Sequence, residues 1–301
     1  MTTGTEPIYI ERASTLRRAA DFAELTKPRI ILMVLVVAAA AFYLASGGRM
    51  NYLHLAHALI GLALANGGAL ALNQVAEEDI DGIMERTSAR PLPAKRVGHQ
   101  NALIFGVALM SLGVVYLILM VNSLTALLTA FAGVLYLLIY TPMKRISSWN
   151  TVVGAIPGAL PPVIGWAAAA GEISVAAWIL FSILFIWQIP HALAIGILYR
   201  EDFEAAQIRI LPVEEPDGRK TGLHAVNFCA ALLPVGMMPT LIGMAGPAYF
   251  LVSLILGTIY LLFGIHLAKE RSVPAARRLF VVSLIYVPLV LLAMVIDRSG
   301  T

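Results

Sequence analysis

The sequence predicts an all-α, polytopic membrane protein with about nine transmembrane helices. Of its 301 residues, 59% are hydrophobic and only 13% are charged, whereas a soluble domain carries about 25% charged residues. The mean hydropathy is +0.82, and uncharged runs of about 20 residues, the length that spans a bilayer, recur along the chain. This composition excludes soluble globular and disordered proteins.

The breaks between the predicted spans carry charges or turn residues, such as Gly47-Gly48-Arg49 and Asn122-Ser123. Residues 1–29 form a predicted N-terminal segment, and residues 30–301 form a single membrane domain. The predicted spans are 30–48, 52–75, 99–120, 123–141, 150–170, 174–198, 222–244, 247–267 and 279–296.

The charges are distributed unequally between the two sides that nine spans create. Of the 21 basic residues, 19 fall on the side of the N-terminus, and the exceptions are Arg49 and Arg298. The positive-inside rule therefore places the N-terminus in the cytoplasm and the C-terminus outside the cell (inner) membrane. The acidic residues, except Glu172 and Asp297, lie on the same side. We expect an active site that opens toward the cytoplasm.

A first acidic motif lies at the end of the second span. Asn73, Glu77 and Asp81 are spaced by four residues, so they share one face of a helix. Carboxylate oxygens are the ligands that Mg²⁺ prefers, and the nearby Arg86 and Arg90 can bind phosphate. This pattern suits a lipid diphosphate; the alternative is a solvated helix end with mixed charges.

A second motif follows the sixth span, where Tyr199 and Asp202 are i, i+3 neighbours. Two acidic helices that face each other could hold Mg²⁺ on both sides of a diphosphate. His191 lies inside the same span, where a histidine is a candidate functional residue. Imidazole can ligate heme iron, although a hydrogen bond within the helix bundle would also explain this histidine.

These motifs resemble the protoheme IX farnesyltransferases (heme O synthases), a branch of the intramembrane aromatic prenyltransferase superfamily. The resemblance runs from Leu25-Thr26-Lys27-Pro28-Arg29 to the last span. Its most specific segments are the first acidic motif with Arg86-Thr87 and Arg90-Pro91-Leu92, and residues 140–145, 150–162, 187–191 and 211–213.

The resemblance implies nine helices around a central cavity, with both motifs binding Mg²⁺ and a prenyl diphosphate. The superfamily often has Asp at positions 74, 77 and 206, where this chain has Gln74, Glu77 and Ala206. These departures also occur in the heme branch and favour heme as the acceptor. The implied site comprises Asn73, Glu77, Asp81, Tyr199 and Asp202 as catalytic residues, with Glu77, Asp81 and Asp202 as metal ligands, Arg86, Arg90, Lys144 and Arg145 as diphosphate ligands, and His191 as a heme ligand.

The implied reaction transfers the farnesyl group of farnesyl diphosphate to a vinyl group of protoheme IX (heme b), giving heme O and diphosphate for heme A/O biosynthesis. Oxidase assembly factors are candidate partners, beside the substrates and the lipid bilayer, and no nucleic acid is expected. A quinone or chlorin precursor is an alternative acceptor. A non-catalytic heme or lipid transporter is a further alternative, but it leaves the acidic clusters unexplained.

Overall fold

The regular structure of the chain is almost entirely helical. A computed structural model describes residues 17–47 and 49–299, so residues 1–16 of the predicted N-terminal segment lie outside the described part. Apart from an isolated bridge between Ala245 and Arg298, the regular elements in the described part are helices. The predicted all-α class is confirmed.

Within the described residues, nine helical segments are long and apolar enough to cross a membrane, as the sequence predicts. Short elements at the chain connections supplement them: α4 (Glu78–Ile83), α11 (Arg200–Ala205) and α12 (Leu211–Glu214). The nine spans are α2 (Pro28–Ala45), α3 (Tyr52–Ala76), α5 (His99–Met120), α6 to α7 (Ser123–Met143), α8 to α9 (Asn150–Ala170), α10 (Val175–Leu198), α13 (Arg219–Leu241), α14 (Pro247–Glu270) and α15 (Val273–Ile296).

Side-chain caps fix where several spans begin. Asn51, Asn122, Ser174 and Ser272 each precede a span and accept a hydrogen bond from a backbone N–H of its first turn. The last span begins at Val273, six residues before the predicted start at 279. The sequence predicted a later start because the uncharged run begins only after Arg277 and Arg278, whereas the helix includes both residues.

Two spans are composite. The fourth passes from α6 (Ser123–Val134) through a π-helix, η1 (Leu135–Tyr140), into α7 (Thr141–Met143). The fifth divides at Leu160 into α8 (Asn150–Ala159) and α9 (Pro161–Ala170), because Pro161 has no N–H for the helical ladder. π-Turns in membrane and soluble helices often mark functional positions, and η1 borders the cavity described below.

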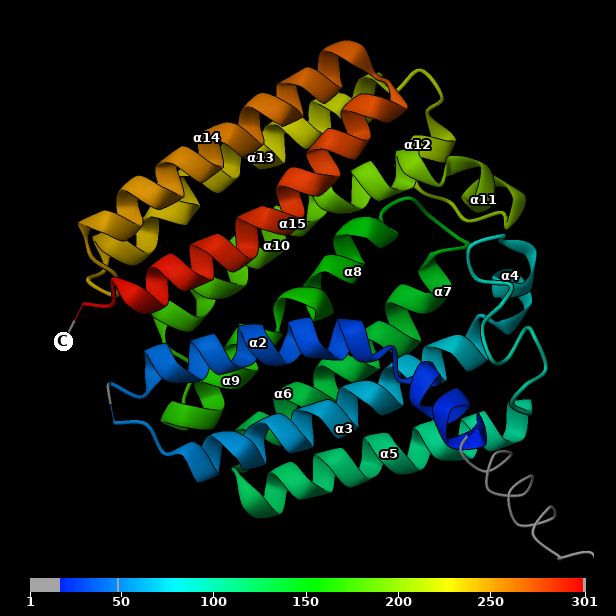
Figure 1. Ribbon diagram of the computed structural model, residues 1–301, viewed down its shortest axis with the longest axis horizontal. Helices are drawn as coiled ribbons and strands as arrows, with labels where there is room; N and C mark the ends of the chain where they lie inside the picture. Colours follow the sequence, from blue (N-terminus) through cyan, green and yellow to red (C-terminus); the bar gives the residue numbers. More distant parts are fainter. Residues whose placement is uncertain (1–16, 48, 300–301) are drawn as a thin grey trace, which may run out of the picture.

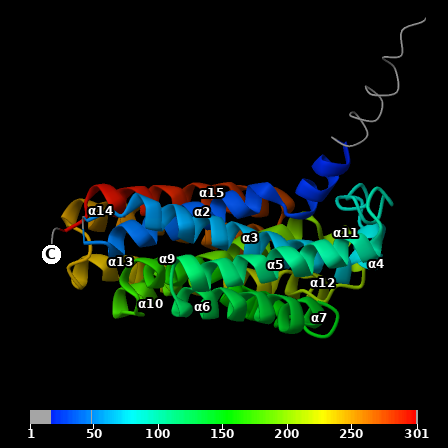
Figure 2. The ribbon, with the colours of Figure 1, turned by 90° about the horizontal axis from the view of Figure 1, so that it is seen from below.

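The long helices run roughly side by side, and their ends separate into two poles (Figures 1 and 2). The short elements α4, α7, α11 and α12 gather at one end, together with the helical residues 17–25 that precede α2. The C-terminus lies at the opposite end. We call the first of these the polar end, since it carries both acidic motifs.

Small residues allow the helix backbones to approach closely. A Cβ atom added to Gly68 of α3 would lie 2.3 Å from the backbone nitrogen of Met110 in α5. A Cβ atom on Gly165 of α9 would lie 2.1 Å from the carbonyl oxygen of Ala38 in α2. Close packing through glycine is typical of membrane helices, which have little hydrophobic driving force between them. Gly165 of the fifth span therefore serves packing, while Pro161 divides the helix.

Candidate active site

An open cavity of about 410 Å³ lies between the two sides of the bundle and reaches toward the polar end. Typical small-molecule sites have volumes of about 300–1,000 Å³, so this cavity is within the range of a ligand site. Its deeper part is bordered by Tyr136, Tyr140, Gly154, Gln188 and His191, and its polar mouth is bordered by Lys27, Asn73, Glu77, Asp81, Arg86, Arg90 and Lys144.

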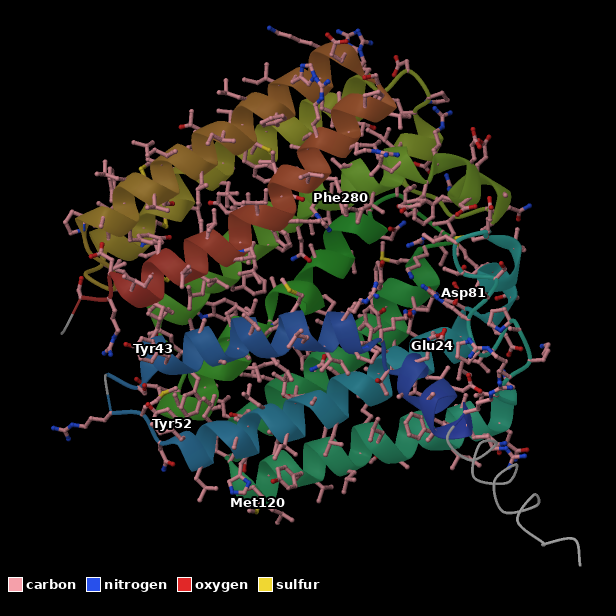
Figure 3. All side chains as sticks on the ribbon, in the orientation of Figure 1. Glu24, Tyr43, Tyr52, Asp81, Met120 and Phe280 are labelled. Atoms are coloured by element: carbon pink, nitrogen blue, oxygen red, sulfur yellow. The ribbon has the colours of Figure 1, made fainter. Side chains whose placement is uncertain are left out.

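The first acidic motif forms one wall of this mouth. The chain bends at Glu77 between α3 and α4, yet the i, i+4 hydrogen bonds continue from Glu77 N–H to the Asn73 carbonyl and from Asp81 N–H to the Glu77 carbonyl. All three side chains of the motif are therefore on one face, as predicted, and all are buried. Figure 3 shows Asp81 at the same end of the bundle as Glu24, far from Tyr43 and Tyr52.

Each carboxylate of the motif pairs with a cation that the sequence analysis assigned to diphosphate. The Nζ atom of Lys144 lies 2.5 Å from Oε1 of Glu77, and Nη1 of Arg90 lies 2.5 Å from Oδ2 of Asp81. The other oxygen of Asp81, Oδ1, is buried and has no hydrogen-bond partner among the described residues. A buried, unpartnered carboxylate oxygen beside a cavity fits a divalent cation.

Asn73 organises a cation that the predicted site did not include. Its Oδ1 accepts hydrogen bonds from Nζ of Lys27 (3.2 Å) and from the hydroxyl of Tyr136 (3.0 Å), and its Nδ2 donates to Thr141 (3.1 Å). The signal for Lys27 was present in the sequence, because the segment Leu25-Thr26-Lys27-Pro28-Arg29 is part of the family resemblance. Its role required the tertiary contact, since Lys27 and Asn73 are 46 positions apart.

The two lysines of the mouth are affected differently by their surroundings. Burial, followed by the neighbouring Arg90 and Lys144 cations, lowers the pKa of Lys27 to about 7. Burial also acts to lower the pKa of Lys144, but Tyr140 and Glu77 outweigh it and raise that pKa above its usual value. Lys144 lies 4.7 Å from the centre of the Tyr140 ring, within range of a cation–π contact.

Arg145, the next residue, lies outside the cavity. Its Nη2 is 2.6 and 2.7 Å from the two carboxylate oxygens of Asp79, and this guanidinium holds the pKa of Asp79 below its usual range. Both side chains are exposed. Because successive residues of a helical turn point in different directions, Lys144 enters the cavity while Arg145 remains on the surface.

The second acidic motif is at the polar end but borders a neighbouring cavity. The carboxylate of Asp202 accepts hydrogen bonds from the backbone N–H groups of Glu85 (3.2 Å) and Arg86 (3.4 Å). Asp202 and Tyr199 line this second cavity, and Arg86 borders both. Arg86 also lies 4.9 Å above the centre of the Tyr199 ring. The described residues contain no group of three His, Cys, Asp or Glu side chains close enough to hold one metal ion.

His191 borders the deeper part of the same cavity. Its ring stacks between Trp187 and Phe280, with centroid distances of 5.1 Å on both sides. Its Nδ1 lies 2.7 Å from the hydroxyl oxygen of Ser283. The structure thus places His191 in the cavity and also gives it a hydrogen bond within the bundle.

Comparison with known proteins identifies the family. Residues 34–287 match the sequence model of the UbiA prenyltransferase family. A protein named protoheme IX farnesyltransferase from Solibacter usitatus is 44% identical over 289 residues, which cover 93% of this chain and 99% of the relative. Proteins of the same name from Koribacter versatilis and Opitutus terrae are each 40% identical, over 99% and 93% of this chain and 100% and 95% of their own lengths.

Solved structures show the same fold at low sequence identity. A digeranylgeranylglyceryl phosphate synthase structure superposes with a TM-score of 0.79 at 16% identity, covering 93% of this chain and 98% of that one. A UbiA homolog from Archaeoglobus fulgidus, bound to GPP and Mg²⁺, superposes with a TM-score of 0.66 at 17% identity, covering 91% of this chain and 99% of that one.

Proposed function

The chain belongs to the UbiA prenyltransferase family, and we propose that it transfers the farnesyl group of farnesyl diphosphate to a vinyl group of protoheme IX, giving heme O and diphosphate. It is a multi-pass membrane prenyltransferase. The names of relatives that are up to 44% identical over almost the whole chain support heme as the acceptor.

The observation that carries the proposal is the charge of the cavity mouth. Four cations, Lys27, Arg86, Arg90 and Lys144, line it together with only two carboxylates, Glu77 and Asp81. Lys27, Arg90 and Lys144 are partly buried and Arg86 is exposed, so this mouth presents an excess of basic groups that favours an anionic ligand. The deeper part of the cavity is largely apolar and aromatic, as a prenyl chain requires. A diphosphate at the mouth with its prenyl chain directed inward satisfies both parts of the site.

The acidic residues fit Mg²⁺. Glu77 and Asp81 supply buried carboxylates at the mouth, and Oδ1 of Asp81 has no partner in the described structure. Asp202 is the third proposed ligand, held at the same end of the bundle by the backbone that follows the first motif. When bound with the prenyl diphosphate, Mg²⁺ would neutralise charge that develops on the leaving group. The A. fulgidus homolog bound to GPP and Mg²⁺ supports this use of the fold.

The residues of the chain favour ionisation of the substrate. Lys27, Lys144 and Arg90 stabilise the departing diphosphate because they are fixed at the mouth before the reaction begins. The farnesyl cation that remains is shielded from water by the helices, in the part of the cavity that Tyr136 and Tyr140 line. The vinyl group of heme then forms the new carbon–carbon bond. Water adds to the resulting cation, which gives the hydroxyl group of heme O and releases a proton.

We further propose that His191 binds the heme, and that Tyr199 acts on the site through Arg86, which stacks on its ring. Arg145 lies at the surface, where it forms an ion pair with Asp79. The surplus of basic residues at the polar end supports a cytoplasmic N-terminus and active site in an inner membrane, with the C-terminus outside. Residues 30–301 are proposed to form one domain, and oxidase assembly factors remain candidate partners.

Product analysis tests the proposal. Membranes that contain the protein should convert heme b and farnesyl diphosphate to a farnesylated, hydrated heme when Mg²⁺ is present, as seen by mass spectrometry. Asp81→Asn should reduce the rate at least about 100-fold. Asp79→Asn is the matched control, since Asp79 is on the same helix but exposed and outside the cavity. A prenylated quinone or chlorin precursor as the product would identify that molecule, and not heme, as the acceptor. Turnover that does not depend on Mg²⁺ would refute the role of the metal ion.

A further inference from the structure

Four side chains from α10 and α15 form a closed cluster at the inner part of the cavity, which we call the His191 cluster: Trp187, His191, Phe280 and Ser283. Trp187 and His191 are one helical turn apart on α10, and Phe280 and Ser283 are one turn apart on α15. The imidazole stacks between the two aromatic rings at interplanar angles of 25° and 29°. Figure 3 shows Phe280 on α15 in the body of the bundle.

Ser283 connects the cluster through three hydrogen bonds. Its backbone carbonyl accepts a hydrogen bond from Nε1 of Trp187 (2.9 Å). Its hydroxyl donates to the backbone carbonyl of Phe280 (2.5 Å) and lies 2.7 Å from Nδ1 of His191. The serine is fully buried, so water does not compete for these contacts.

The hydrogen bonds determine which nitrogen of His191 carries the proton. A serine hydroxyl has a single proton to donate, and here the Phe280 carbonyl receives it. With its proton donated to the Phe280 carbonyl, the Ser283 oxygen accepts from Nδ1, which favours the neutral imidazole that is protonated at Nδ1. The lone pair of this tautomer is on Nε2.

This lone pair is on the side of the ring that is left for the cavity. The two faces of the imidazole are covered by Trp187 and Phe280, and its Nδ1 edge is covered by Ser283. His191 nevertheless borders the cavity. No described residue forms a hydrogen bond with Nε2, and this atom is not among the fully buried unpartnered atoms of the described structure. A fixed, unprotonated imidazole nitrogen at a cavity wall is a ligand for a transition metal ion.

We infer that Ser283 is a positioning residue, which holds His191 as the Nδ1–H tautomer so that Nε2 ligates the iron of the acceptor porphyrin. The inference rests on the proposed function, because it takes heme as the acceptor. Iron ligation at this point would anchor the macrocycle inside the bundle, on the apolar side of the diphosphate mouth. Hydrogen-bonded partners of a metal-ligating histidine fix the ring orientation and increase the basicity of the ligand.

Porphyrin titration of the purified protein, without farnesyl diphosphate, tests the ligand. Heme b and metal-free protoporphyrin IX have the same macrocycle and differ in the iron. His191→Ala should weaken heme b binding about 100-fold and remove the histidine-ligated optical and electron paramagnetic resonance spectra. Binding of protoporphyrin IX should change less than about twofold, and free imidazole should restore the heme spectrum of the variant, since only the ligand atom is missing.

Substitution of Ser283 tests the positioning role separately. Ser283→Ala should weaken heme b binding about tenfold and shift the ligand-field spectrum, because the imidazole loses its acceptor. Ser283→Thr retains the hydroxyl and should restore the spectrum. Ser253→Ala is the matched control: Ser253 is a similarly buried serine that donates to the Gly236 carbonyl, and its substitution should leave heme binding unchanged.

Two results would overturn the inference without affecting the proposed function. Iron ligation fails if His191→Ala binds heme b and protoporphyrin IX as the wild type does. The positioning role fails if Ser283→Ala retains the wild-type spectrum and affinity. In both cases, formation of farnesylated heme from heme b and farnesyl diphosphate would still support the reaction, whereas its failure in the wild type would refute the function itself.

Discussion

Replacement of Lys144 by methionine separates folding from catalysis at the cavity mouth. The side chains of Lys144 and Glu77 are only 16% and 6% exposed, and their charged atoms are 2.5 Å apart. At an effective dielectric constant of about 20, this distance corresponds to an attraction of about 7 kcal/mol. Desolvation offsets part of it, and the removal of one partner of a buried pair costs about 3–5 kcal/mol.

We therefore expect Lys144→Met to lower the free energy of unfolding by about 3–5 kcal/mol, because Glu77 keeps a buried charge without its partner. The double variant Glu77→Gln/Lys144→Met should recover most of that loss, since neither side chain is then charged. Turnover should fall about 100- to 1,000-fold in Lys144→Met and should not return in the double variant, which lacks both a cation and a carboxylate of the site.

The assay is unfolding in mixed micelles with increasing dodecyl sulfate, followed by tryptophan fluorescence, beside the farnesylation rate of the same preparations. Lys144→Arg serves as the control that retains the charge. An unchanged unfolding free energy in Lys144→Met would show that the pair is not the buried contact described here. Recovery of turnover in the double variant would refute the role of these two residues in catalysis.

Three further substitutions test the cavity. The pKa of Lys27 is about 7, and a bound diphosphate would raise it, so binding above pH 7 takes up a proton and the affinity for pyrophosphate should fall by up to about tenfold per pH unit. Calorimetry from pH 6 to 9 should show a weaker pH dependence of this affinity in Lys27→Arg. The same pH dependence in the variant and the wild type would exclude Lys27 as the cause. Tyr199→Phe should retain the farnesylation rate because Arg86 contacts the aromatic ring. Tyr199→Ala should lower the rate, since it removes a cation–π contact of about 0.5–2 kcal/mol. A low rate in Tyr199→Phe would instead assign a role to the hydroxyl. Gly154→Val should raise the KM for farnesyl diphosphate, since even a Cβ atom at Gly154 would lie 2.5 Å from the Tyr140 ring; an unchanged KM would show that this wall does not contact the substrate.

The membrane topology and the first acidic motif follow from local periodicity. Hydropathy alone located nine spans, and the spacing of Asn73, Glu77 and Asp81 placed them on one face, which the structure confirms despite the bend at Glu77. The number of spans depends on the apolar length of each segment, and the shared face depends on helix geometry, so both are properties of single segments of the chain. The break of the fourth span into a π-helix, η1, was not predicted, because a π-turn has no simple hydropathy signature.

The composition of the site depended on contacts between distant segments. Lys27 joins the site because α2 begins beside Asn73, while Arg145, adjacent to Lys144 in the sequence, remains outside and pairs with Asp79. Asp202 accepts hydrogen bonds from the backbone of Glu85 and Arg86 and lines a cavity next to that of the first motif. A pattern of residue types does not reveal which of two neighbouring cavities a carboxylate borders.

The sequence by itself determined that this chain lies in a membrane, how many times it crosses, and which helix face carries the first acidic motif, because apolar length and helical periodicity are properties of single segments. The tertiary structure decided which cation pairs with which carboxylate, which oxygen of Asp81 has no partner among the described residues, and how Ser283 orients His191. These features are set by the packing of helices that are far apart in the sequence, where a shift of a few ångströms makes or breaks a hydrogen bond.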